Sequence, residues 1–288
     1  VALTLLGSGP TDLDSVNAEI TSIDGSTATG NIIINSTSVT TASNIKTGTG
    51  ADTIIMAHKD DVIDANTGAD SLVVNFTSVI GGMAIDLSAT GDQIATFNGA
   101  ANAASQSGFQ HADLSGYAGN GAEITAHASG STIVGTALVD SITSGIAADI
   151  ITGGAGNDLI TLTDDTDADV IKFSDSNGSD TISGFTINED TLNFGALITN
   201  IDVATEVAMS TGATKHAGTD ATTYVFASDQ DGGAGGTITT FTNTTDVATY
   251  LATNITAANG EEYIAVVNDL SGQDVYAYHI IATATNAA

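Results

Sequence analysis

Short apolar clusters alternate with small polar residues along most of the chain. From Ile23 onward, clusters such as 32–34 are separated by only a few residues of Ser, Thr, Asn and Gly. Apolar runs of this length, bounded by turn-forming residues, are typical of short β-strands. The pattern therefore predicts an all-β domain built from many short strands.

One short unit recurs along the chain: an aspartate, any residue, and then a branched aliphatic residue. It occurs in two runs with nine-residue steps, which indicates a repeat architecture. The aspartates of the first run are Asp52, Asp61 and Asp70, and those of the second are Asp140, Asp149 and Asp158, with Asp167 nine residues further on. If one coil holds two nonapeptides, residues 18 apart stack on the same edge. The predicted stacked pairs are Asp52 with Asp70, Asp140 with Asp158, and Asp149 with Asp167.

The clearest copy of the repeat spans residues 153–161 and reads Gly-Gly-Ala-Gly-Asn-Asp-Leu-Ile-Thr. Its glycines permit a tight turn whose carbonyl groups point inward, and its aspartate offers a hard oxygen ligand to Ca²⁺. A cation between stacked turns would also remove the repulsion between neighbouring carboxylates. The predicted calcium-binding residues are Gly153, Gly154, Gly156 and Asp158, with Asp140, Asp149, Asp167, Asp52, Asp70 and Asp61 in less complete copies.

Two other interpretations of these residues stay open. Asp and Gly are also common turn residues between short strands, with no ion involved. Residues 165–169 read Asp-Thr-Asp-Ala-Asp and start like an EF-hand loop. The sixth position of that loop is Val170 rather than Gly, and the twelfth is Ser176 rather than Glu. The segment is therefore better explained as a nonstandard cation site or a solvated acidic turn.

Changes of pattern along the chain predict three regions. Residues 1–21 contain the only proline and are expected to be a connector. Residues 22–195 are expected to form a parallel β-roll or β-helix. Residues 196–288 hold five of the six tyrosines and are expected to form a β-rich C-terminal domain with a hairpin around 268–273. Apolar residues at every fourth position predict one helix between 245 and 258.

Charge narrows the classes of partner. The chain has 34 acidic residues, four lysines and no arginine, and its formal net charge is −30. Nucleic acids and anionic membranes are bound through Lys and Arg, so both are excluded as expected partners. No apolar run is long enough to predict insertion into a membrane. With no cysteine, disulfides cannot stabilise the chain, and bound metal ions are the natural substitute.

Three segments together resemble the calcium-binding RTX proteins exported by type I secretion, in particular their surface-layer members. They are the nonapeptide 153–161, the Asp-rich stretch 170–194 and the β-rich segment 263–280. The resemblance implies a parallel β-roll with Ca²⁺ as ligand. It also implies secretion to the extracellular cell surface and assembly of copies into a lattice or filament. Cell-surface polysaccharide is a further candidate partner if the chain is instead a binding module.

Catalysis is not expected from this sequence. The zinc motif H-E-x-x-H, the nucleophile elbow G-x-S-x-G, a phosphate-binding loop and cysteine are all missing from the chain. The hypothesis is therefore a self-assembling structural protein whose folding depends on calcium. The alternatives are a secreted, calcium-stabilised adhesin and the noncatalytic roll of a larger secreted protein.

Overall fold

The computed structural model describes most of the first 193 residues and several strands beyond them. The described ranges are 1–56, 58–163, 165–173, 178–186 and 189–193, followed by 207–208, 216–217, 223–227, 255–256, 262–269 and 274–281. Every regular element in these ranges is a β-strand. A helix that could cross a membrane is not found in this part of the chain.

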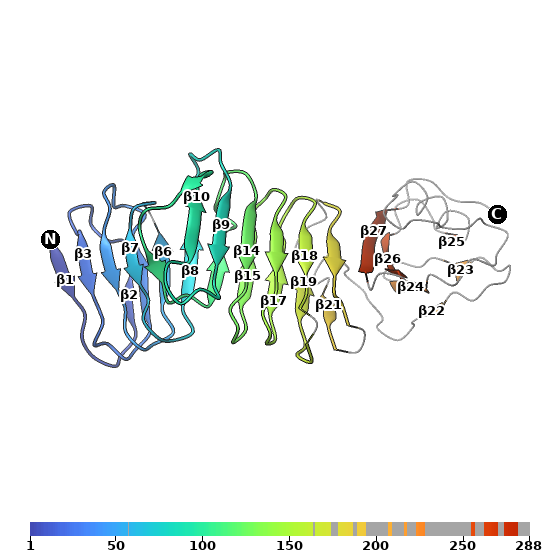
Figure 1. Ribbon diagram of the computed structural model, residues 1–288, viewed down its shortest axis with the longest axis horizontal. Helices are drawn as coiled ribbons and strands as arrows, with labels where there is room; N and C mark the ends of the chain where they lie inside the picture. Colours follow the sequence, from blue (N-terminus) through green and yellow to red (C-terminus); the bar gives the residue numbers. More distant parts are fainter. Residues whose placement is uncertain are drawn as a thin grey trace.

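The chain winds into a parallel β-solenoid, as its repeat predicts (Figure 1). Each coil contributes one strand to a nine-stranded parallel sheet that runs along the solenoid. In order, this sheet consists of β2 (Thr11–Leu13), β4 (Ile32–Asn35), β6 (Thr53–Met56), β8 (Ser71–Val74), β13 (His111–Asp113), β15 (Thr132–Val134), β17 (Ile150–Thr152), β19 (Val170–Lys172) and β21 (Thr191–Asn193).

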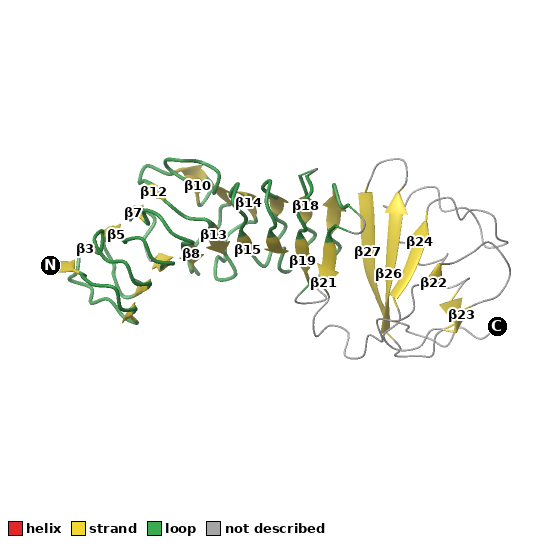
Figure 2. Cartoon of the chain, turned by 90° about the horizontal axis from the view of Figure 1, so that it is seen from below, coloured by secondary structure: helices red, strands yellow, loops and turns green. Residues whose placement is uncertain are grey.

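Two successive sheets face this one across the core (Figure 2). The first contains β1 (Ala2–Thr4), β3 (Ser22–Asp24), β5 (Asn44–Lys46), β7 (Val62–Asp64) and β12 (Gln106–Ser107). The second contains β11 (Ala100–Ala101), β10 (Ile94–Phe97), β9 (Met83–Asp86), β14 (Ala122–Thr125), β16 (Ser141–Thr143), β18 (Leu159–Thr161) and β20 (Thr181–Ser183), and continues into C-terminal strands. The side opposite the nine-stranded sheet is therefore divided between two sheets. The first sheet ends at β12, and β9 belongs to the second.

The aliphatic residue of each repeat unit fills the core. In the three-residue strands the central side chain points inward and its neighbours point outward, because side chains alternate along a strand. The predicted core residues are all buried: Ile54, Ile63, Leu72, Ile142, Ile151 and Ile160 have exposed fractions of 0 or 1%. Burial of each such side chain stabilises the fold by about 1.5–3 kcal/mol, so a thin core of stacked aliphatic layers suffices.

Residues 1–21 form the first coil of the solenoid, and the predicted connector is wrong on this point. β1 pairs in parallel with β3, and β2 pairs in parallel with β4. Pro10 stands directly before β2, where its missing N–H interrupts no ladder hydrogen bond. Neither strand of this coil is preceded by the Asp-x-aliphatic unit, whose one copy here, Asp14-Ser15-Val16, lies after β2, so the repeat pattern did not mark the coil.

The repeat loses its phase over residues 76–130 because one coil carries an excursion. His111 pairs with Ser71, 40 residues earlier, whereas Ser71 pairs with Thr53, only 18 earlier. Residues 94–101 fold back as the hairpin of β10 and β11, whose turn uses the positive φ angles of Asn98 and Gly99. The stretch 99–106 also belongs to this excursion and includes β11 and the start of β12.

The C-terminal strands confirm the predicted hairpin. β26 (Glu262–Asp269) and β27 (Asp274–Ile281) are antiparallel, and β26 also pairs in parallel with β24 (Thr223–Ala227). The remaining strands are β22 (Val207–Ala208), β23 (His216–Ala217) and β25 (Ile255–Thr256). Residues 255–256 are thus a strand at the end of the predicted helix, and the rest of 245–258 lies outside the described residues.

Candidate cation site

The aspartate of each repeat unit points into the solenoid. It lies two residues before the core aliphatic residue, and residues two apart in extended chain share one face. Carboxylates are rarely this buried. The exposed fractions are 0% for Asp52 and Asp70, 1% for Asp61, Asp140, Asp149 and Asp158, and 2% for Asp169.

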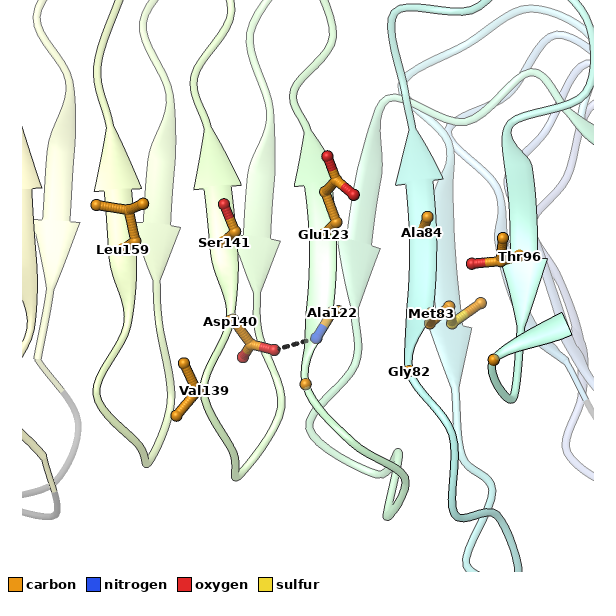
Figure 3. A pocket seen from close by; sticks show the side chains of 12 residues that line it. Gly82, Met83, Ala84, Thr96, Ala122, Glu123, Val139, Asp140, Ser141 and Leu159 are labelled. Carbon is orange, nitrogen blue, oxygen red and sulfur yellow. Dashed lines mark hydrogen bonds between the residues drawn. The ribbon is translucent and has the colours of Figure 1, made fainter.

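These carboxylates connect neighbouring coils by hydrogen bonds. The backbone N–H of Asp140 donates to Oδ1 of Asp158 at 2.9 Å, and the N–H of Ala122 donates to Oδ1 of Asp140 at 2.5 Å (Figure 3). Likewise, the N–H of Asp52 donates to Oδ1 of Asp70 at 2.8 Å. The predicted stacking of Asp52 on Asp70 and of Asp140 on Asp158 is therefore confirmed. Each of these aspartates accepts a hydrogen bond from a backbone N–H of the preceding coil, and strand pairing would leave that N–H without an acceptor.

The third predicted pair is wrong. The N–H of Asp149 donates to Oδ1 of Asp169 at 2.8 Å, so Asp149 stacks on Asp169 rather than on Asp167. Asp167 is exposed, and its N–H donates to the side chain of Asp165 within the turn. The cause is a lengthened coil, because Ile150 pairs with Val170, 20 residues later, rather than with a residue 18 later.

Two further aspartates belong to this stack of hydrogen-bonded carboxylates, which we call the aspartate ladder, although the nine-residue spacing does not predict them. The N–H of Asp158 donates to Oδ1 of Asp180 at 3.0 Å, and the N–H of Asp169 donates to Oδ1 of Asp190 at 3.0 Å. Both aspartates stand in the same Asp-x-aliphatic unit as the others. The unit itself, rather than its spacing, was the signal that could have found them.

The second carboxylate oxygen divides the ladder into two kinds of position. At Asp140, Oδ2 accepts the backbone N–H of Thr136 at 2.6 Å, and at Asp149 it accepts the N–H of Gly145 at 2.6 Å. Such a carboxylate closes its own turn and needs no ion. In contrast, Oδ2 of Asp52 and Oδ2 of Asp70 are buried with no hydrogen-bond donor. Asp61 belongs to the first kind, since its Oδ2 accepts the N–H of His58 at 3.0 Å.

Burial disfavours the charged form of several of these carboxylates and raises their pKa. Desolvation, together with the nearby charge of Asp52, raises the pKa of Asp70 to about 7, although the N–H bond from Asp52 lowers it. Desolvation likewise raises the pKa of Asp169 to about 6, with Asp149, Asp190 and Asp165 adding negative charge nearby. No lysine of the described residues lowers the pKa of Asp70 or of Asp169.

The glycine turn at residues 153–158 is shaped around its carboxylate. Gly154 and Gly156 have φ angles of 109° and 128°, which other residues rarely adopt. A Cβ on Gly153 would lie 2.3 Å from Oδ2 of Asp158. The structure thus places Gly153 against the carboxylate of Asp158, whereas Gly154 and Gly156 pack on the preceding coil at Thr136 and Leu138. In the corresponding turn before Asp70, Asn66 supplies a positive φ of 66°, a conformation that Asn tolerates better than most residues.

Cation binding at these turns would depend on few side chains. The described residues contain no cluster of three or more His, Asp or Glu side chains arranged to hold a metal ion. A site here would therefore combine one or two carboxylates with backbone carbonyl oxygens, a ligand set that suits Ca²⁺. The paired, donor-free oxygens of Asp52 and Asp70 fit such a site, whereas the fully bonded carboxylates of Asp140 and Asp149 do so less well.

Comparisons with known proteins give no match, whether with protein families, with curated proteins or with solved structures.

The buried carboxylates predict how stability depends on pH without divalent ions. A group whose pKa is raised on folding stabilises the fold below its unfolded value and loses that contribution as pH rises through the folded value. For Asp70 this window runs from 3.8 to about 7, and for Asp169 from 3.8 to about 6. We expect the melting temperature in EDTA to fall by roughly 5–10 °C between pH 5 and pH 8. Calorimetry at constant ionic strength tests this, and a melting temperature that rises over the same range would contradict it.

Proposed function

We propose that this chain is a calcium-stabilised, secreted structural protein of a bacterial cell surface, which assembles with copies of itself. The observation that carries the calcium part is the pair of buried, donor-free Oδ2 atoms of Asp52 and Asp70 in adjacent coils. A buried carboxylate oxygen without a partner costs stability, and a cation is the natural compensation in a chain with four lysines.

The residues that would hold the ion are the turn carboxylates and the glycine-rich backbone beside them. Asp52 and Asp70 supply oxygens from the first run, while Asp158 with the backbone of Gly153, Gly154 and Gly156 forms the complete repeat of the second. A bound Ca²⁺ would supply positive charge to hard oxygen ligands. The ladder bonds already hold these carboxylates one coil apart, so ion binding would add little ordering cost.

Calcium linkage explains how such a chain could be exported and then fold. Where calcium is scarce, the buried carboxylates oppose folding because their charge is not compensated. Where calcium is abundant, as outside a cell, binding to the folded form alone adds its binding free energy to stability, by about 2.7 kcal/mol per site at 100 times the dissociation constant. The extracellular location and self-assembly rest on the resemblance of the repeats to RTX surface-layer proteins.

The test is a calcium titration of the purified chain with three measurements: circular dichroism, melting temperature and negative-stain microscopy. We expect millimolar Ca²⁺ to raise the melting temperature and to produce sheets or filaments, and an equal concentration of Mg²⁺ to do neither. A chelator that leaves folding and melting unchanged would contradict the calcium part. A calcium-loaded protein that stays monomeric would contradict self-assembly and favour a secreted adhesin.

A further inference from the structure

Acidic residues are nearly missing from the outer faces of the second half of the solenoid. We call the outer face of β14, β16, β18 and β20 the groove face, and the outer face of β15, β17, β19 and β21 the lysine face. The two sheets enclose the core between them, so these faces point in opposite directions (Figures 1 and 2). Each face carries one charged residue among the outward positions of its strands, in a chain whose net charge is −30.

On the groove face the charged residue is Glu123. It is exposed and lies in a cross-strand row with Ala84 on one side and Ser141, then Leu159, on the other. A shallow groove with a volume of about 490 Å³ runs over this row, and β10 forms its far wall through Thr96 (Figure 3). Glycines and apolar side chains form most of its lining, and 45% of Leu159 and 62% of Val139 are exposed.

On the lysine face the charged residue is Lys172, which has the opposite sign. It is exposed, and its cross-strand neighbours are Thr152 and Asn193. Lys46 and Lys59 form ion pairs with Asp64 and Asp60, but Lys172 forms none with any described residue. An exposed lysine with no carboxylate partner among the described residues is available to a carboxylate from outside the chain.

We propose that Lys172 of one copy enters the groove of the next copy and pairs with Glu123. This inference rests on the proposed self-assembly and names the surfaces through which it proceeds. Copies with a charge of −30 repel one another, so contact is favoured where acidic residues are fewest. The long aliphatic stem of the lysine suits a groove with apolar walls, and its ammonium group meets the carboxylate of Glu123. The other carboxylate of the lining, Asp140, is buried and already accepts two backbone N–H groups. Because the two faces point in opposite directions, the contact repeats without closing and yields an open array.

Charge reversal tests the contact, with assembly in millimolar Ca²⁺ followed by light scattering and sedimentation. Glu123→Lys places two cations opposite each other, and Lys172→Glu places two carboxylates opposite each other. We expect each variant alone to need at least about a tenfold higher protein concentration than the wild type to assemble, because like charges meet at the contact. An equal mixture of the two variants is expected to assemble nearly as the wild type does, since each can then offer its altered residue to the other.

Glu19→Lys is the matched control. Glu19 is exposed in the first coil, so the same change of charge far from both faces should leave assembly as in the wild type. Melting temperatures verify that all variants fold. If the single variants assemble like the wild type, or if their mixture fails to recover, the contact is overturned while calcium-dependent self-assembly stands. If the wild type itself stays monomeric in calcium, both proposals fall.

Discussion

Asp70→Asn is expected to stabilise the calcium-free protein and to destabilise the calcium-loaded one. Asparagine keeps the oxygen that accepts the N–H of Asp52. It also removes the buried carboxyl group, whose pKa is raised to about 7. At pH 8 in EDTA we expect a gain of about 2 kcal/mol, or roughly 5 °C in melting temperature, after allowance for burying the amide. In millimolar Ca²⁺ the variant has lost a ligand, so its melting temperature should fall below that of the wild type.

Asp140→Asn is the matched control at a ladder position whose two oxygens are both occupied. Its Oδ1 accepts the N–H of Ala122 and its Oδ2 accepts the N–H of Thr136. In asparagine one of these two oxygens is replaced by an NH₂ group, which would face a backbone N–H donor instead of accepting from it. The variant should therefore be less stable than the wild type with or without calcium. An ion site is identified if Asp70→Asn raises the melting temperature in EDTA and lowers it in Ca²⁺, while Asp140→Asn lowers it in both. A loss of stability in both conditions at Asp70 would mean that its carboxylate is only another turn cap.

The fold could be predicted because its signal is local and repeated. An aspartate two residues before an aliphatic residue specifies a turn, an inward carboxylate and a core position at once, and six such aliphatic residues are buried as predicted. The first coil was missed because its strands 2–4 and 11–13 lack that unit. Their place in the fold depends on parallel pairing with β3 and β4, which involves residues about 20 positions away in sequence.

The candidate site was predicted in its residues but not in its hydrogen bonds. Spacing located Asp52, Asp70, Asp140 and Asp158 correctly, yet it paired Asp149 with Asp167 because a longer coil shifts the register by two residues. Spacing also cannot show whether the second oxygen of a carboxylate has a donor. That depends on whether the turn presents an N–H, as Thr136 does for Asp140, and this is a property of turn conformation.

The turn glycines make the second large prediction, for Gly154→Ala. Gly154 has a φ angle of 109°, and a Cβ there would lie 1.9 Å from the carbonyl oxygen of Thr136 in the preceding coil. An alanine must therefore adopt a strained backbone and push two coils apart, which also disturbs the ladder bond between Asp140 and Asp158. We expect a loss of about 3 kcal/mol or more, or roughly 6–12 °C in melting temperature, measured by calorimetry.

Gly91→Ala separates this steric effect from the general loss of a glycine. Gly91 has no atom within 4 Å of the position of an added Cβ, and its φ is not in the left-handed region. Its replacement should therefore change stability by less than about 0.5 kcal/mol. If Gly154→Ala were as mild as Gly91→Ala, the turn could not have the conformation that packs Gly154 on Thr136 and places Gly153 against Asp158. A cation site at the complete repeat would then have no geometric basis, whereas the site at Asp52 and Asp70 would not be affected.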